Sequence, residues 1–304
     1  MRIMTTGRVT DNFYILGSST YPVYLLDLPD QPIIFESGIA CAGEVYVEAL
    51  REVLGNRQPA FLFLSHAHWD HAGSAAYLKG DFPALQIAAS SLAGEVLKRP
   101  GAVQVITQLN LDANDLVKWE SGFDLTRLIK QPFQPFTIDL ELRDGQVVEV
   151  DATTSIQVLA TPGHTRDHLS YYLPRQKILV AVESGGYMSS SGKIEAEFVA
   201  DYDAYITSIG RLAELPAEVL CQGHNLVFTG RDEIKEFFIS SMQEAVLYKD
   251  RICELLREEK GSTDRVVQRM KAERYDNVEG FKQDEFVYTL NLAAQVKHIA
   301  AKYF

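Results

Sequence analysis

Short apolar runs bounded by turn residues fill the first part of the chain and predict β-strands that alternate with helices. Two short strands are expected over residues 12–36, in NFYILG and YPVYLLDL, and the segment PIIFESG follows them. Residues 43–54 have helical spacing of apolar positions and end at Gly55. The run PAFLFLS is continuously apolar, as in a strand buried on both faces. A helix near residues 72–79, a strand QIAAS and a mostly helical stretch from about 91 to 130 complete this part.

A second block of strands covers residues 136–183, and long helical patterns follow from about residue 231. The strands are predicted in FTIDLEL, QVVEV, IQVLATPGH, LSYYL and KILVAVE. The helices are predicted over roughly 232–258, 262–274 and 283–303. Strands with helices inserted between them predict an α/β fold of two packed sheets covered by helices. We therefore expect a main domain over residues 1–230 and an α-helical C-terminal extension over residues 231–304.

One helical pattern in the extension predicts a polar stripe. Asn291, Gln295, His298 and Lys302 recur at spacings of 4, 3 and 4 residues, which is typical of the solvent face of an amphipathic helix. We expect His298 to be a surface residue.

Composition restricts the class of protein and its partners. The chain has 304 residues, 46% of them apolar, and no apolar run approaches the roughly 18 residues needed to span a bilayer. Its three cysteines are far apart, which predicts free thiols, and we expect a cytoplasmic protein with no membrane partner. Residues 1–230 hold 16 basic and 27 acidic residues, which argues against a nucleic-acid partner.

Residues 65–73, SHAHWDHAG, gather three of the seven histidines beside an aspartate. In an extended segment residues i and i+2 point the same way, so His66 and His68 can converge on one ion as the chain leaves the strand. Asp70 and His71 follow after a turn and face a different direction, toward a second ion. Imidazole and carboxylate groups suit zinc, iron or manganese. The spacing predicts a site for two divalent metal ions.

Two more histidines follow predicted strands and extend this set. His164 lies in TPGHTRDH, where Pro162 and Gly163 end a strand, and His224 lies in CQGHN after an apolar run. Two ions about 3.5–4 Å apart would share a water with a pKa near 7, and the resulting metal-bound hydroxide would attack a carbonyl or phosphoryl centre. In this interpretation Asp70 is both a metal ligand and the residue that orients the hydroxide.

The pattern HxHxDH, followed by two GH motifs, resembles the metallo-β-lactamase-fold hydrolases over about residues 10–230. That resemblance implies a metallo-β-lactamase αββα sandwich. It implies a first ion held by His66, His68 and His164. It implies a second ion held by Asp70, His71 and His224.

Glu183 departs from the pattern of the family. The family places an aspartate at the end of a strand, where it bridges both metals, whereas KILVAVESGG offers Glu183, one methylene longer. We predict that Glu183 is a metal ligand. Asp201 and Asp203 are alternative carboxylates, although we expect them to cap the following helix. His168 is predicted to orient a ligand rather than to bind metal. Tyr187 either hydrogen-bonds the substrate carbonyl, as in related lactonases, or only packs.

The resemblance predicts a hydrolase and leaves several functions open. The helical tail looks most like the quinolone signal response thioesterase type, so we expect cleavage of a small ester, thioester or lactone, with a small-molecule substrate and a homodimer as one arrangement. Zinc is the expected metal, with iron and manganese as alternatives. An iron-dependent oxygenase like the persulfide dioxygenases is one rival, and a metal-binding regulatory protein with little turnover is another. A β-lactamase and a nuclease fit the pattern less well.

Other residues near the motifs have two interpretations each. Segment 105–135 forms either a lid over the site or the inner face of a packed helix pair, through residues that include Leu109, Leu111, Trp119, Phe123 and Phe133. Trp69 either lines the pocket or braces the loop of metal ligands. Cys221 is expected to be a buried, inert thiol.

Overall fold

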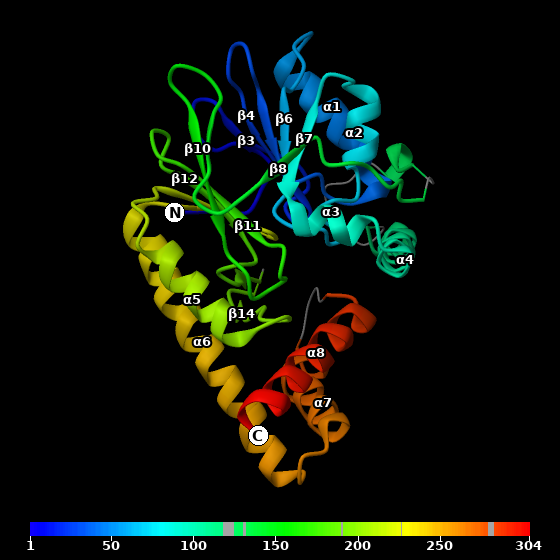
Figure 1. Cartoon of the computed structure of the whole chain (residues 1–304), viewed down its shortest axis with the longest axis vertical. Coiled ribbons are helices and arrows are strands. Elements are labelled where there is room, and N and C mark those ends of the chain that lie inside the picture. Colours follow the sequence, from blue (N-terminus) through cyan, green and yellow to red (C-terminus); the bar gives the residue numbers. More distant parts are fainter. Residues whose placement is uncertain (118–124, 130–131, 190, 226, 279–282) are drawn as a thin grey trace.

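Two seven-stranded sheets form the centre of the molecule (Figure 1). The computed structural model describes residues 1–117, 125–129, 132–189, 191–225, 227–278 and 283–304. The first sheet contains, in order, β2 (Gly7–Arg8), β3 (Phe13–Gly17), β4 (Pro22–Leu26), β5 (Ile33–Phe35), β6 (Phe61–Phe63), β7 (Gln86–Ser90) and β8 (Leu140–Leu142). The second contains β1 (Arg2–Ile3), β16 (Val227–Thr229), β15 (Val219–Gln222), β12 (Ile178–Val182), β11 (Leu169–Leu173), β10 (Ser155–Ala160) and β9 (Val147–Glu149).

Both sheets are mixed, and their parallel strands determine where loops can meet. Strands β5, β6, β7 and β8 are parallel neighbours, as are β12 and β15, whereas the other described pairs are antiparallel. In the first sheet Leu62 pairs with Ile34 and with Ile87. The carboxyl ends of parallel strands lie at one edge of a sheet, which is the usual place for ligand sites in such folds.

Helices cover the outer faces of both sheets and complete a four-layer sandwich. An apolar cluster that includes Phe35, Phe63 and Tyr171 fills the space between the sheets. A second cluster joins the first sheet to α1 (Gly43–Leu54), α2 (Ala75–Asp81), α3 (Ser91–Leu97) and α4 (Pro100–Leu116), with η1 (Ala40–Ala42) and η3 (Leu125–Arg127) between the longer elements. A third joins the second sheet to α5 (Tyr202–Ala213) and α6 (Arg231–Glu258). The predicted αββα sandwich is confirmed.

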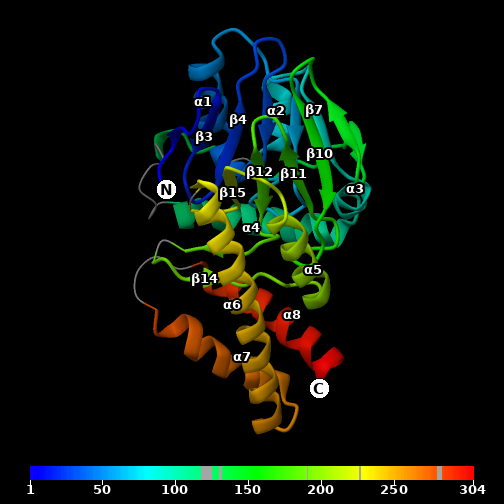
Figure 2. The ribbon, with the colours of Figure 1, turned by 90° about the vertical axis from the view of Figure 1, so that its left-hand side faces the viewer.

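Helices also follow the sandwich to the C-terminus. The long helix α6 runs along the outside of the second sheet and continues beyond it (Figure 2). It leads into α7 (Thr263–Lys271), the π-helical turn η4 (Ala272–Asp276) and α8 (Glu285–Tyr303). These last elements lie at one end of the sandwich, below the sheets in Figure 1. The small hairpin of β13 (Tyr187–Met188) and β14 (Ile194–Glu195) contacts α6, so the helices adjoin the loop that follows β12.

Two members of the predicted polar stripe of α8 face neighbouring elements of the protein. Gln295 is buried, where it donates to the Ala196 carbonyl and accepts from the Tyr248 hydroxyl. His298 is half-buried and accepts a hydrogen bond of 3.0 Å from the Tyr202 N–H at the start of α5. The expectation of a surface His298 is therefore wrong. Gln295 and His298 are polar because they form hydrogen bonds with buried polar groups of neighbouring elements.

The structure shows the positions of Asp201, predicted to cap a helix, and of most of segment 105–135, predicted to be either a lid or a packed helix pair. Asp201 caps α5 by accepting from the Ala204 N–H, as expected. In segment 105–135, Leu109 and Phe133 are buried in the cluster beside the first sheet, which favours packing for these two residues. Leu111 is exposed. Trp119 and Phe123 lie outside the described residues.

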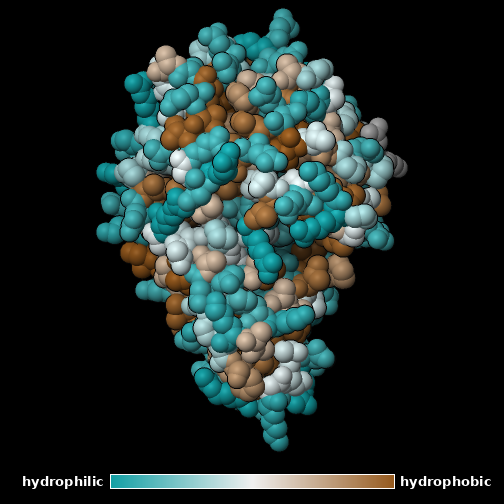
Figure 3. Space-filling view, in the orientation of Figure 1, coloured by the Kyte–Doolittle hydropathy of each residue, from teal (hydrophilic) through white to brown (hydrophobic). Residues whose placement is uncertain are grey.

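The cysteines, the helix lengths and the surface can be compared with the expectations drawn from composition. Cys41, Cys221 and Cys253 are all buried free thiols, and burial raises the pKa of Cys221, which keeps it protonated. Among the described helices, none is both long and apolar enough to cross a membrane. The face drawn in Figure 3 mixes hydrophilic and hydrophobic residues.

Gly163 permits the close approach that brings the His164 loop against α5, and its replacement tests this packing. Its φ is +135°, and a Cβ added there would lie 2.3 Å from the Tyr205 Cα. We expect Gly163→Ala to lower the free energy of unfolding by about 1–3 kcal/mol. As a matched control, a Cβ at Gly210 in α5 would meet no described atom within 4 Å beyond the adjacent backbone of its own helix. Gly210→Ala should therefore raise the free energy of unfolding by about 0.5–1 kcal/mol. Urea unfolding measures both, and equal stability of the two variants would contradict the packing.

Candidate metal centre

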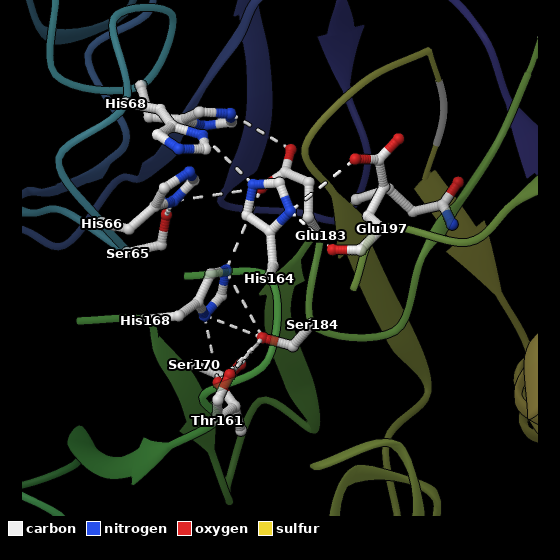
Figure 4. Close-up of polar contacts among 12 residues, drawn as sticks. Ser65, His66, His68, Thr161, His164, His168, Ser170, Glu183, Ser184 and Glu197 are labelled. Carbon is white, nitrogen blue, oxygen red and sulfur yellow. Dashed lines mark hydrogen bonds and ion pairs between the residues drawn. The ribbon is translucent and has the colours of Figure 1, made fainter. Parts of the chain in front are cut away.

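The predicted site residues come from the ends of strands in both sheets. His66 follows β6 and His164 follows β10, while Glu183 follows β12 and His224 follows β15. Figure 4 shows His66, His68, His164 and Glu183 directed toward one another. Residues up to 158 positions apart in the sequence thus meet at one edge of the sandwich, because the two sheets place their strand ends there.

His66, His68 and His164 form a first set of potential ligands. Each offers one ligand atom, and these atoms lie within 4.8 Å of one another. His164 Nε2 is 3.1 Å from His68 Nδ1, and the ring centroids of His66 and His68 are 4.4 Å apart. Three imidazole nitrogens at this separation can surround one ion.

Asp70, His71 and His224 form a second set, and their ligand atoms also lie within 4.8 Å of one another. His224 Nε2 is 3.6 Å from Asp70 Oδ2, and His71 Nε2 is 3.8 Å from Asp70 Oδ1. The structure therefore brings together the same two groups of three residues that the motifs predict. Whether each group binds a metal remains a prediction.

The Glu183 carboxylate lies between the two sets. Its Oε1 is 3.1 Å from His71 Nε2 and 3.2 Å from His224 Nε2, both in the second set. Its Oε2 is 4.0 Å from the Nδ1 of His66, in the first set. This is the place that a bridging carboxylate would occupy.

Three buried atoms at this point have no hydrogen-bond partner among the described residues. They are His66 Nε2 and both carboxylate oxygens of Glu183. The nitrogens of His71 and His224 are close to Glu183, but their ring geometry does not make a hydrogen bond. A buried carboxylate and a buried imidazole nitrogen without partners are costly. Divalent cations would satisfy these atoms, so the residues present fit a metal centre.

Hydrogen bonds behind the rings determine which nitrogen of each histidine faces inward. His164 Nδ1 donates to the Glu197 carbonyl over 2.8 Å, and His224 Nδ1 donates to the Thr20 carbonyl over 2.6 Å. A carbonyl can only accept, so in both rings Nε2 is left to face the site. Such outer hydrogen bonds orient the ligands of metal sites.

Glu36 orients His71 and the end of β6 in the same way. Its Oε2 is 3.0 Å from His71 Nδ1, and its Oε1 accepts a hydrogen bond of 2.9 Å from the Ser65 N–H. Glu36 is buried and has a φ of 62°, a left-handed conformation that is uncommon for a residue with a side chain. Sequence reasoning missed its role. An acidic residue directly after the buried strand in PIIFESG was the available signal.

His168 lies behind Glu183 rather than within either set. Its Nδ1 is 2.7 Å from Ser184 Oγ and 3.1 Å from Thr161 Oγ1, and its Nε2 is 3.9 Å from Glu183 Oε2. Ser184, Thr161 and Ser170 form a buried hydroxyl cluster around it (Figure 4). This arrangement suits the orienting role predicted for His168.

The two sets differ in protonation. Burial lowers the pKa of His68 to about 4 and that of His164 to about 3. Burial also disfavours charge on His71 and His224, but the neighbouring carboxylates, of which Glu183 acts most strongly, together outweigh it and raise the pKa of both rings. Burial alone would raise the pKa of Glu183, but its interactions with His71, His168 and His224 together lower that pKa well below its usual value, so Glu183 is a carboxylate. Without metal, negative charge is thus balanced by protons on the second set.

Two aromatic rings, those of Tyr187 and Tyr21, contact the ring of His224. The Tyr187 ring is 5.4 Å from the His224 ring, and the Tyr21 ring is 6.0 Å from it on a T-shaped contact. Trp69 is buried and packs edge-on against Tyr21, which favours its bracing role. Burial, and then Glu197, raise the pKa of Tyr187, so its hydroxyl stays protonated.

Glu197 is a second acidic residue that sequence reasoning missed. Its Oε2 is 3.7 Å from His164 Nδ1, and its side chain is 12% exposed. Burial and the nearby Glu183 raise the pKa of Glu197 to about 8. It follows a short hairpin strand without any motif, so no signal in the sequence pointed to it.

Comparisons with known proteins agree with this geometry. The metallo-β-lactamase superfamily model matches residues 19–224. The chain is 26% identical over 217 residues to the beta-lactamase-like protein 2 homolog of Caenorhabditis elegans, and 37% identical over 79 residues to a hydroxyacylglutathione hydrolase of Rhodopseudomonas palustris. These matches span 71% and 26% of this chain. They cover only 58% and 29% of the respective relatives.

Solved structures share the fold at low sequence identity. A metallo-β-lactamase family protein from Thermus thermophilus superposes with a TM-score of 0.62 at 17% identity. The superposition covers 99% of this chain and 92% of that one. The similarity therefore extends through the C-terminal helices.

The difference in protonation predicts that the two sets lose metal at different pH. A metal must displace a proton from His71 and His224, whereas the first set is already neutral near pH 5. As the pH falls from about 7 to about 5, we expect one ion per chain to leave and the other to stay. Metal analysis after dialysis at each pH measures this, and loss of both ions in a single step would contradict it.

Proposed function

Because the chain belongs to the metallo-β-lactamase superfamily, whose members are mostly hydrolases, we propose that it is a binuclear metal-dependent hydrolase of a small ester, thioester or lactone. The observation that carries this proposal is the buried Glu183 carboxylate, which accepts no hydrogen bond from the described residues and lies between two sets of ligand atoms. A single cation would satisfy only one of the two sets, whereas the oxygens of Glu183 face both sets.

Each potential ligand has a position in this proposal. His66, His68 and His164 would hold one ion, while Asp70, His71 and His224 would hold the other, with Glu183 between them. Two divalent ions there would lower the pKa of a water molecule and polarise the bond to be cleaved. The predominance of imidazole favours zinc, and iron or manganese would also accept this donor set.

The protein's own groups orient the reactants. Asp70 is only 11% exposed in its side chain and faces both His71 and His224, so its second oxygen can accept a hydrogen bond from the attacking water. The protonated hydroxyl of Tyr187 beside His224 can donate to the oxygen of the substrate carbonyl.

The thioester is the bond we favour among the three. Support comes from the likeness to a hydroxyacylglutathione hydrolase, whose name describes a thioester, over 79 residues. The helical tail, which resembles that of the quinolone signal response thioesterase type, points the same way. Oxygenase chemistry and metal binding without turnover are the alternative outcomes of the experiment below.

A substrate panel with the metal-loaded protein tests the proposal. We expect turnover of thioesters, and weaker turnover of lactones and simple esters, with little hydrolysis of phosphodiesters. The matched variant Glu183→Ala should lose the second ion preferentially and with it most activity, whereas Glu183→Asp should keep both ions. Full metal content without turnover of any of these compounds would refute the hydrolase. Oxygen consumption with a persulfide would instead favour the dioxygenase.

Tyr187→Phe tests the hydroxyl without changing the ring. If the hydroxyl donates to the carbonyl in the transition state, kcat should fall on the order of 100-fold while KM and metal content hardly change. Tyr303→Phe, an exposed tyrosine near the end of α8, serves as the control. An unchanged kcat in Tyr187→Phe would show that Tyr187 only packs beside His224.

A further inference from the structure

The Glu183 carboxylate occupies space that exists because residue 223 has no side chain. A Cβ added to Gly223 would lie 1.7 Å from Glu183 Oε1 and 2.6 Å from its Cδ. It would also lie 3.0 Å from Val182 Cγ1. Non-bonded atoms do not approach to such distances. An alanine at position 223 and the carboxylate in its present position therefore exclude each other.

Gly223 is needed for this space and not for its backbone conformation. Its φ lies outside the left-handed region that favours glycine, unlike that of ten other glycines in the described chain. It directly precedes His224, whose Nε2 is 3.2 Å from Glu183 Oε1. The same segment therefore carries His224, a member of the second set, and leaves space for the Glu183 carboxylate that His224 contacts.

The end of β12 is shaped for the same purpose. The pairing of β12 with β15 shifts register between Val180 and Val182, and Val182 has a φ of 53°, which is unfavourable for a β-branched residue. A tight turn follows, in which the Ser184 N–H donates to the Ala181 carbonyl and the Gly186 N–H donates to the Glu183 carbonyl. The strand therefore ends in an irregularity directly before Glu183. We relate this irregularity to the longer side chain that follows.

We propose that Gly223 is a positioning residue that holds the Glu183 carboxylate between the two sets, so that the glycine and the glutamate act as a matched pair. This inference rests on the proposed metal centre. A Cβ at position 223 would displace the carboxylate from His71 and His224, and the second set would lose its bridging oxygen. The conflict involves the far end of a flexible side chain, so the fold tolerates it while metal binding does not.

Shortening residue 183 relieves the closest contact, and this defines the experiment. An aspartate lacks one methylene, so it places no atom at the position of Glu183 Oε1, which is the atom nearest to the added Cβ. We compare wild type, Gly223→Ala, Glu183→Asp and the double variant. The readouts are metal content, affinity for the more weakly held Zn²⁺ by competition with a chelator, and thermal unfolding. Gly210→Ala, where a Cβ meets no described atom within 4 Å beyond the adjacent backbone of its own helix, controls for the added methyl group.

In Gly223→Ala we expect at least a tenfold loss of affinity for the weaker ion with little change in unfolding. In the Glu183→Asp background the same substitution should lower that affinity by a much smaller factor. An equal loss in both backgrounds would overturn the inference, since the methyl group would then act directly on His224. Unchanged affinity in Gly223→Ala would also overturn it. If Gly223→Ala does not fold, a folded double variant supports the pair, and an unfolded one refutes it.

The outcome of this experiment can be distinguished from the outcome of the test of the proposed function. Two ions in wild type and the expected pattern among the variants would support the pair even if no substrate were hydrolysed. Conversely, hydrolysis with equal affinities for the weaker ion in wild type and Gly223→Ala would support the function and overturn the pair.

Discussion

The need to balance a buried negative charge is the constraint on which the metal centre depends. Within the described residues, neither buried oxygen of Glu183 nor the neighbouring His66 Nε2 has a hydrogen-bond partner. An isolated carboxylate in such surroundings is strongly disfavoured, and a cation must balance it. In the metal-free chain protons on His71 and His224 supply that charge. In the proposed enzyme metal ions would supply that positive charge instead. Binding of metal to the second set is therefore coupled to loss of the protons from His71 and His224.

The two sheets provide the rigid support that holds the residues of the metal centre in place. Parallel strands β5 and β6 in one sheet, and β12 and β15 in the other, end at the same edge. Carbonyl groups and a carboxylate behind the rings then orient three of the imidazoles, as Glu36 does for His71 and the Thr20 carbonyl for His224. The ligands are preorganised because backbone elements, rather than flexible loops, determine their directions.

The sequence predicted what local periodicity and spacing encode. The helix over residues 43–54 and the strand over residues 86–90 have the expected bounds because each has its apolar pattern within one segment. The residues of HxHxDH could be assigned to two groups because their neighbours in the sequence are also neighbours in space. Both inferences needed no knowledge of distant contacts.

Features that depend on distant contacts could not be predicted. The polar stripe of α8 has the spacing of a solvent face, yet His298 and Gln295 satisfy groups that lie 96 and 99 residues away. Glu36 has no motif, and its contact with His71 forms only when β5 and β6 pair. The fit between Gly223 and Glu183 likewise depends on a pairing of β12 with β15.

Titration of Zn²⁺ into metal-free protein, with hydrolysis of a thioester followed at each step, tests the central claim most directly. The account predicts little hydrolysis while the first equivalent per chain binds and a steep rise as the second binds. Full activity at one equivalent, or none at two, would contradict a binuclear hydrolase.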